Sequence, residues 1–145
     1  MSIYIVQLLT GVAYGMLYFM IAAGLTIILG VMNVVNLAHG AFFLLGTYLA
    51  FTFISLHFNF WLALLLSVVV TAVLGIIIEK LLINKIYGKE LEQVLLTFGL
   101  TFVIADAAKW IWGTEMQTIA VPELLNASIT IGDMVFPAYR LFVVL

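Results

Sequence analysis

The stretch YIVQLLTGVAYGMLYFMIAAGLTIIL, residues 4–29, decides the fold class of this chain. Its clearly polar members are Gln7, Thr10 and Thr26, and about 20 mainly apolar residues are enough for a helix to cross the hydrocarbon layer of a bilayer. No Lys or Arg precedes the stretch, and it is longer than the roughly 7–15 residues of a signal-peptide apolar core. We therefore expect a retained membrane-spanning helix.

The composition of the whole chain also indicates a membrane protein. Of its 145 residues, 66% are hydrophobic and 8% are charged, whereas a soluble domain has about 25% charged residues. The mean hydropathy is +1.31, and a soluble fold of this length would leave too much apolar surface in water. With five Lys and Arg and a net charge of -2, the chain lacks the basic patch of a nucleic-acid-binding protein. It has no cysteine, which excludes disulfides and thiolate metal sites.

Further apolar runs follow this first span, and a polar break precedes the second span. The segment GVMNVVNLAHG, residues 30–40, interrupts the apolar sequence with two Asn and one His. We predict an all-α fold: a polytopic transmembrane helix bundle with a polar, glycine-flanked break near the start of the second span. We expect one transmembrane domain over residues 1–145, with spans at roughly 4–29, 39–56, 60–83 and 94–112 and the start of a fifth at 136.

The charged segment NKIYGKELEQ, residues 84–93, sets the orientation of the spans. It holds Lys85 and Lys89, so the positive-inside rule predicts that it faces the cytoplasm. The segment at 113–137 carries acidic but no basic residues, and we expect it outside. Its Thr, Ile and Val content permits a short hairpin or an extended stretch, although Pro122 and Gly132 would limit it. The N-terminus lies outside if the second span crosses fully, and inside if that stretch is re-entrant.

The break supplies the candidate functional residues. Asn33, Asn36 and His39 are spaced by three, so in a helix they would share one face within roughly 120° of arc. Unpaired amide and imidazole groups cost several kcal/mol in hydrocarbon, so the stripe must face other helices, water or a solute. Two interpretations stay open: the residues hold the bundle in register, or they line a solute path together with Gly40. No acidic, Ser or Cys partner lies near His39, so we expect no catalytic residue and no metal site.

Two other residue pairs have a structural explanation. Gly11 and Gly15 form a G-x-x-x-G spacing in the first span, which predicts close helix packing. Asp106 and Lys109 lie three apart near the outer end of the fourth span, where we expect a structural ion pair. A proton relay would need more than one buried carboxylate, and the first three spans contain none before Glu79.

The segment GLTIILGVMNVVNLAHGAFFLLGTYLA, residues 24–50, resembles the branched-chain amino-acid permease family of bacterial ABC importers, the LivH-type permeases. The most specific piece is NLAHG at 36–40, followed by the G-x-Y of 46–48. LLTFGLTFVIADAAKWIWG at 95–113 and PAYRLF at 137–142 also resemble the family in order and spacing. The resemblance covers essentially the whole chain but about half of a family member, so we expect the N-terminal half of a longer permease.

This resemblance implies a function and a set of partners. The chain would be a multi-pass permease subunit in the bacterial inner membrane, translocating branched-chain or related amino acids delivered by an extracytoplasmic binding protein. Its partners would be a second homologous permease and two cytoplasmic ATPase subunits, with no nucleic acid and no cofactor. It would not be an enzyme itself, because the partner subunits would hydrolyse the ATP. Asn33, Asn36, His39 and Gly40 would then border the substrate pathway.

Two alternatives to amino-acid import stay open. Some amino-acid permeases of the family carry an acidic residue directly after A-H-G, where this chain has Ala41. Urea or short amides are therefore the alternative substrates. A passive channel for a small polar solute, with the break as its selectivity constriction, is the alternative of another class.

Overall fold

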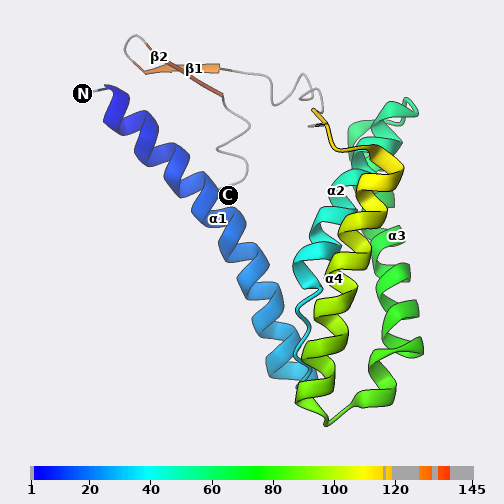
Figure 1. The fold of residues 1–145 in the computed structure, drawn as a ribbon. Coiled ribbons are helices and arrows are strands. Elements are labelled where there is room, and N and C mark those ends of the chain that lie inside the picture. The colour runs from blue at the N-terminus through cyan, green and yellow to red at the C-terminus, as the bar shows by residue number, and fades with distance from the viewer. Residues whose placement is uncertain (1, 116, 119–127, 132–133, 138–145) are drawn as a thin grey trace. The chain divides into compact units, whose positions relative to one another are not determined.

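The computed structural model describes residues 2–115, 117–118, 128–131 and 134–137. These residues form four long helices, one π-helical turn, one 3-10 turn and one pair of short strands (Figure 1). The helices dominate, which confirms the predicted all-α membrane fold. The chain divides into two compact units, one of Gly24–Ile119 and one of Met1–Ala23 with Ala120–Leu145. Each unit is described by itself.

Helix α1 spans Ser2–Ile27 and continues through the π-helical turn η1, Ile28–Met32. Together they give an apolar stretch of 30 residues, Ile3–Met32, which is long enough to cross a membrane. Tyr4 and Leu8 are among its many exposed large apolar side chains. A helix that is apolar on all sides has lipid or other apolar helices as its surroundings.

A short antiparallel strand pair is described near the end of the chain. Strand β1, Ser128–Ile131, pairs with strand β2, Met134–Pro137. This is the short hairpin for which the Thr, Ile and Val content of the segment leaves room. The fifth span, predicted from 136, starts within β2, and its remaining residues 138–145 lie outside the described part of the chain.

Three helices make the unit that holds the polar break. Helix α2 spans His39–Ser55, α3 spans Phe60–Leu81 and α4 spans Glu90–Trp112, with α2 packed against both others (Figure 1). The side-chain oxygen of Asn59 accepts a hydrogen bond from the Trp61 N–H at 3.0 Å. This bond satisfies one of the free N–H groups at the start of α3 and fixes where the helix begins.

The interior of this unit is built from small side chains. Ala38, Ala41, Ala63 and Ala108 are all buried, and a Cβ added to Gly46 in α2 would lie 3.4 Å from the Thr71 hydroxyl of α3. Small residues allow helix backbones to approach closely, which is the usual basis of helix packing in membranes. Many of the large apolar side chains are exposed, whereas Val34, Ile83 and Ile104 are buried.

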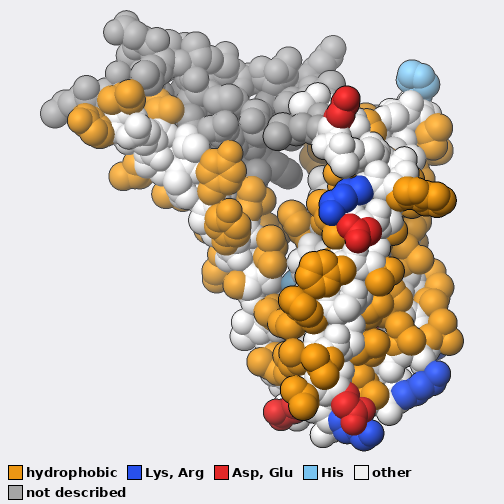
Figure 2. Space-filling model, viewed as in Figure 1, with side chains coloured by type: hydrophobic (Ala, Val, Ile, Leu, Met, Phe, Trp, Pro, Cys, Tyr) orange, Lys and Arg blue, Asp and Glu red, His pale blue; other side chains and the backbone are white. Residues whose placement is uncertain are grey.

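The surface of the unit separates lipid-facing from water-facing parts. Figure 2 shows apolar side chains covering α3 and α4 along their length, and charged side chains gathered where the chain turns between them. That turn contains the 3-10 helix η2, Ile83–Ile86. The 22 residues of α3 and the 23 residues of α4 can cross a bilayer, whereas α2 has 17. The exposed apolar residues include Leu65, Val68, Phe102 and Val103.

Candidate functional site

The backbone leaves the helical conformation at residues 33–38, which we call the linking segment. Asn33 adopts a left-handed conformation, with φ 54° and ψ 38°, and its N–H donates to the Leu29 carbonyl at 3.0 Å. Asn tolerates this conformation better than most residues, and a helix commonly ends there. The interpretation of Asn33, Asn36 and His39 as one helical stripe is therefore wrong, because the chain unwinds at Asn33 and α2 begins only at His39.

Side chains of α4 hold the backbone of the linking segment. The Val35 N–H donates to Gln93 Oε1 at 3.1 Å, and the Leu37 N–H donates to Thr97 Oγ1 at 3.1 Å. Two residues of extended chain advance about 6.6 Å, and four residues of α-helix advance about 6 Å. Alternate amides of the segment therefore match side chains spaced four apart on one face of α4.

The α4 side chains that make these contacts lie in the interior of the unit, and the contacts themselves are part-buried. Gln93 and Thr97 are both 0% exposed, and Val34 of the linking segment is 2% exposed. Leaving a polar group unpaired in an apolar environment costs roughly 2–7 kcal/mol. Non-helical backbone inside a membrane is tolerated only where protein or a water-filled path satisfies it. Gln93 and Thr97 supply that satisfaction here.

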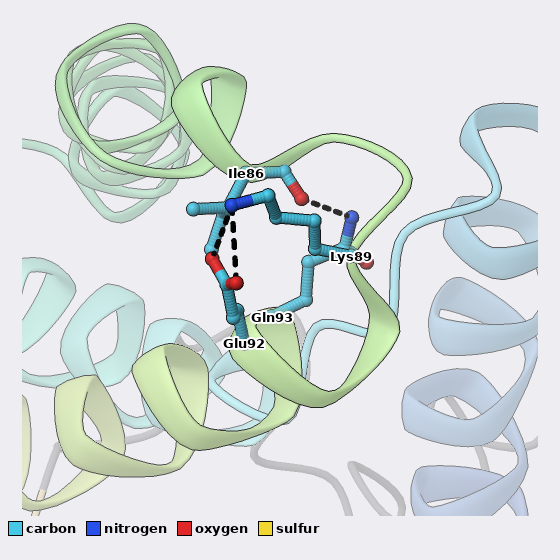
Figure 3. Close-up of polar contacts among 4 residues, drawn as sticks. All are labelled: Ile86, Lys89, Glu92 and Gln93. Atoms are coloured by element: carbon cyan, nitrogen blue, oxygen red, sulfur yellow. Dashed lines mark hydrogen bonds and ion pairs between the residues drawn. The ribbon is translucent and has the colours of Figure 1, made fainter.

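Gln93 also contacts the turn between α3 and α4. Its Nε2 donates to the Ile86 carbonyl at 3.1 Å, beside the ion pair of Lys89 with Glu92 (Figure 3). One buried amide therefore reaches two separate stretches of backbone. Elsewhere in the turn, the Tyr87 hydroxyl donates to Glu79 Oε1 at 2.7 Å. This hydrogen bond raises the pKa of Tyr87, and burial and the charge of Glu79 act in the same direction.

Asn36 organises the start of α2. Its Oδ1 accepts from the Ala38 N–H at 3.1 Å, and its backbone carbonyl accepts from the His39 N–H at 3.3 Å. Such a turn, in which the Asn side chain binds the backbone two residues on, is a common way to enter a helix. Asn33 and Gly40 are exposed, whereas Asn36 and His39 are half-buried.

The ring of His39 lies against the backbone of Gly24, near the end of α1. A Cβ built on Gly24 would lie 2.6 Å from His39 Nε2 and 2.9 Å from Cε1. These distances are far inside van der Waals contact, so a residue larger than glycine cannot occupy position 24 while His39 keeps its place. His39 therefore packs where the first helix approaches the second.

A second set of contacts fastens α2 to the far end of α4. The rings of Tyr48 and Trp112 stack with centroids 5.1 Å apart, and Trp112 Nε1 donates to Thr52 Oγ1 at 2.7 Å. At the other end, Val35 is bound to Gln93, one turn into α4. The stretch from Val35 to Thr52 thus accompanies α4 over nearly its whole length, first as unwound chain and then as helix.

Comparison with known proteins places this arrangement in a family. Residues 7–144 match the family model for the branched-chain amino acid transport system permease component. The chain belongs to this family. The high-affinity branched-chain amino acid transport system permease protein BraD of Pseudomonas aeruginosa is 27% identical over 140 residues, which are 90% of this chain and 45% of that protein. LivH of Escherichia coli K12 is 24% identical over 136 residues, 87% of this chain and 44% of LivH.

This permease chain spans a little under half the length of the curated relatives it matches. LivH of Salmonella typhimurium, 23% identical, gives a similar share of 44%. No solved structure matches the chain. The relatives are transport permease components and not enzymes, and the family together with the apolar helices places the chain in the inner membrane.

The remaining predicted residues are an ion pair in α4 and two glycines in α1. Lys109 Nζ is 2.9 Å from Asp106 Oδ1, and both side chains are more than half exposed, so solvent and salt weaken their attraction. A Cβ added at Gly11 or Gly15 meets nothing within 4 Å in the described part of the chain. Close packing at these two glycines stays a prediction.

Sequence reasoning missed the α4 residues that hold the linking segment. Gln93, Thr97 and Thr101 follow one another at intervals of four, and Thr101 Oγ1 lies 3.4 Å from the Leu37 carbonyl. This spacing puts three polar side chains on one face of an otherwise apolar helix. The pattern is visible in the sequence, because a polar stripe on a membrane span must face a partner.

Proposed function

We propose that this permease chain is part of an ABC importer for branched-chain or related amino acids. The observation that carries the proposal is the unwound linking segment, set beside the first half of α4 in a chain of this family. Interrupted membrane helices form the substrate sites of many transporters, because unwound backbone offers polar groups at membrane depth. Asn33, Asn36, His39 and Gly40 border the pathway in this proposal.

The partners follow from the family and are part of the same proposal. The permease pairs with a second, homologous permease, and two cytoplasmic ATPase subunits bind and hydrolyse the ATP. An extracytoplasmic solute-binding protein delivers the amino acid. Closure of the ATPases rocks the two permeases from one access state to the other, and the solute passes between their helices along weak polar contacts such as the exposed amide of Asn33.

Reconstitution tests the substrate and the energy source together. The complete importer is placed in liposomes with its binding protein outside, and uptake of labelled leucine is compared with uptake of labelled urea. We expect leucine uptake that requires both the binding protein and ATP. Uptake of urea but not leucine would replace the amino-acid proposal with the amide alternative, for which the Ala41 that follows A-H-G is the supporting feature.

The same liposomes distinguish an importer from a channel. The permeases without ATPases are loaded with solute on one side, and downhill flux is measured. The importer proposal predicts no flux above that of protein-free liposomes, because alternating access needs the ATPases. Downhill flux of leucine or urea through the permeases alone would establish the channel and overturn the proposal.

A further inference from the structure

We propose that Gln93 is a positioning residue that connects the turn between α3 and α4 to the linking segment. A displacement of the turn, centred on Ile86, would then move the backbone at Val35. This inference rests on the proposed function, since it assigns a route by which events at the predicted cytoplasmic surface reach the pathway. The candidate residues at the break, Asn33, Asn36, His39 and Gly40, do not include Gln93.

The two ends of the Gln93 amide are both engaged. Its oxygen accepts from the Val35 N–H and its nitrogen donates to the Ile86 carbonyl, each at 3.1 Å. Both partners are backbone groups, so the two hydrogen bonds depend on the position of the main chain and not on that of a mobile side chain. Gln93 is 0% exposed, and its partner residues Val35 and Ile86 are half-buried.

The base of this side chain is fixed as well. Gln93 lies in the first turn of α4, where its N–H donates to the Lys89 carbonyl at 3.0 Å. Its own carbonyl accepts the Thr97 hydroxyl at 2.7 Å. The amide therefore acts as a rigid spacer between Ile86 and Val35, and neither stretch can shift alone without breaking one of these part-buried hydrogen bonds.

The turn between α3 and α4 has a buried inner side and an exposed, charged outer side. Ile83 of η2 is buried and anchors its inner side, while Lys85, Lys89 and Glu90 are exposed at its surface. Gly88 has a φ of 78°, a conformation that other residues rarely adopt. The charged outer side is thus accessible to a partner or to water. On the inner side, the Ile86 carbonyl contacts Gln93 (Figure 3).

Thr97 is the comparison residue. It helps to decide whether Gln93 connects the turn to the linking segment or only satisfies the backbone of that segment. Thr97 also binds the linking segment, through the Leu37 N–H and through the Val35 carbonyl at 3.3 Å, but no described contact joins Thr97 directly to the turn. If Gln93 only satisfies the backbone of the segment, its removal and the removal of the Thr97 hydroxyl should have similar effects. If Gln93 connects the two stretches, only its removal should separate them.

Hydrogen–deuterium exchange on the complete permease in nanodiscs tests the connection. The turn is perturbed by Gly88→Ala, which strains the left-handed conformation without filling occupied space. Exchange at the Val35 and Leu37 amides is then measured in the parent, Gln93→Met and Thr97→Val backgrounds. Gln93→Met keeps the length of the side chain and removes both bonds, and Thr97→Val keeps the shape and removes the hydroxyl.

We expect Gly88→Ala to speed exchange at Val35 about fivefold or more in the parent, the lower range of coupling between sites. The same response should persist in Thr97→Val and vanish in Gln93→Met. No response in the parent, or an undiminished response in Gln93→Met, would overturn the inference. Gln93→Leu replaces Gln93→Met if the latter does not fold. Because exchange is measured without transport, a failed connection is distinguishable from a failed importer proposal.

Discussion

At the scale of single residues, two positions depend on backbone geometry more than on side-chain chemistry. Asn33 holds a positive φ where the π-helical turn ends, and Gly24 leaves room for the ring of His39. Both are common residue types in membrane spans and loops, and neither is charged. Their importance comes from what larger or branched side chains would do there.

Replacing Asn33 by Val should destabilise the permease, because a branched residue in the left-handed region costs about 1–2 kcal/mol. Asn33→Gly should retain stability, since glycine adopts this conformation freely. Thermal unfolding in detergent, followed by size-exclusion chromatography, measures the difference. Met32→Val, one position earlier in the π-helical turn, is the control for the change of side chain. Equal losses for Asn33→Val and Asn33→Gly would contradict the conformational explanation.

Gly24→Ala should lower stability by about 1–3 kcal/mol, the usual cost of overpacking, because the new methyl group would overlap the imidazole of His39. A second change, His39→Ala, should relieve that overlap, so the double variant should be more stable than the sum of the single effects predicts. Gly30→Ala is the matched control, because its Cβ meets nothing within 4 Å in the described residues. Additive effects of the two changes would rule out direct contact.

At the scale of elements, the linking segment and α4 form a matched pair. The segment presents alternate amides and α4 presents a side chain at every fourth residue, which brings Val35 to Gln93 and Leu37 to Thr97. The pairing replaces the helical hydrogen bonds that the segment gives up at Asn33. Backbone groups that are shielded from water need such partners.

Thr97→Val should cost about 1–3 kcal/mol, because it leaves the Leu37 N–H, in a part-buried contact, without its acceptor. Thr47→Val is the control: the Thr47 hydroxyl is exposed and bonds to the Phe43 carbonyl of its own helix, so little stability should be lost. Equilibrium unfolding of both variants in the same detergent gives the comparison. Similar stability of the two variants would mean that the pairing contributes nothing.

The sequence predicts the helices of this chain better than it predicts the break. Apolar length alone indicates α3 at 60–83, close to the observed Phe60–Leu81. For α4 the hydropathy pattern suggests a start at 94, whereas the helix begins at Glu90, because polar residues in the first turn do not count toward an apolar run. The position of the break follows from its Asn, His and Gly residues. Its conformation does not, since the groups that stabilise it lie 58 and 60 residues away.

At the scale of the whole molecule, the contacts of α2 bear on the membrane topology. The chain from Val35 to Thr52 runs beside α4 from Gln93 to Trp112. Because this stretch accompanies a helix long enough to span a membrane over nearly its full length, we predict that it crosses the membrane and does not re-enter. With the turn around Lys85 predicted in the cytoplasm, alternation then puts the N-terminus outside.

Labelling of introduced cysteines checks this topology, and these 145 residues contain no cysteine of their own. In intact cells with a permeable outer membrane, Ser2→Cys should react with a membrane-impermeant maleimide. Asn84→Cys should react only after the inner membrane is opened. Protection of Ser2→Cys together with labelling of Asn84→Cys would reverse the orientation.

The linking segment also dictates an order of events during synthesis. When it leaves the ribosome, the residues that will satisfy its backbone have not yet been made, because Gln93 follows Val35 by 58 residues. At about 5–20 residues per second, Gln93 arrives roughly 3–12 s later. During that interval the backbone amides of the segment lack these partners and are unfavourable in lipid. The segment is therefore expected to stay in water or within the insertion machinery. The second span therefore takes its final place only when the fourth arrives, and the two enter the bilayer as partners.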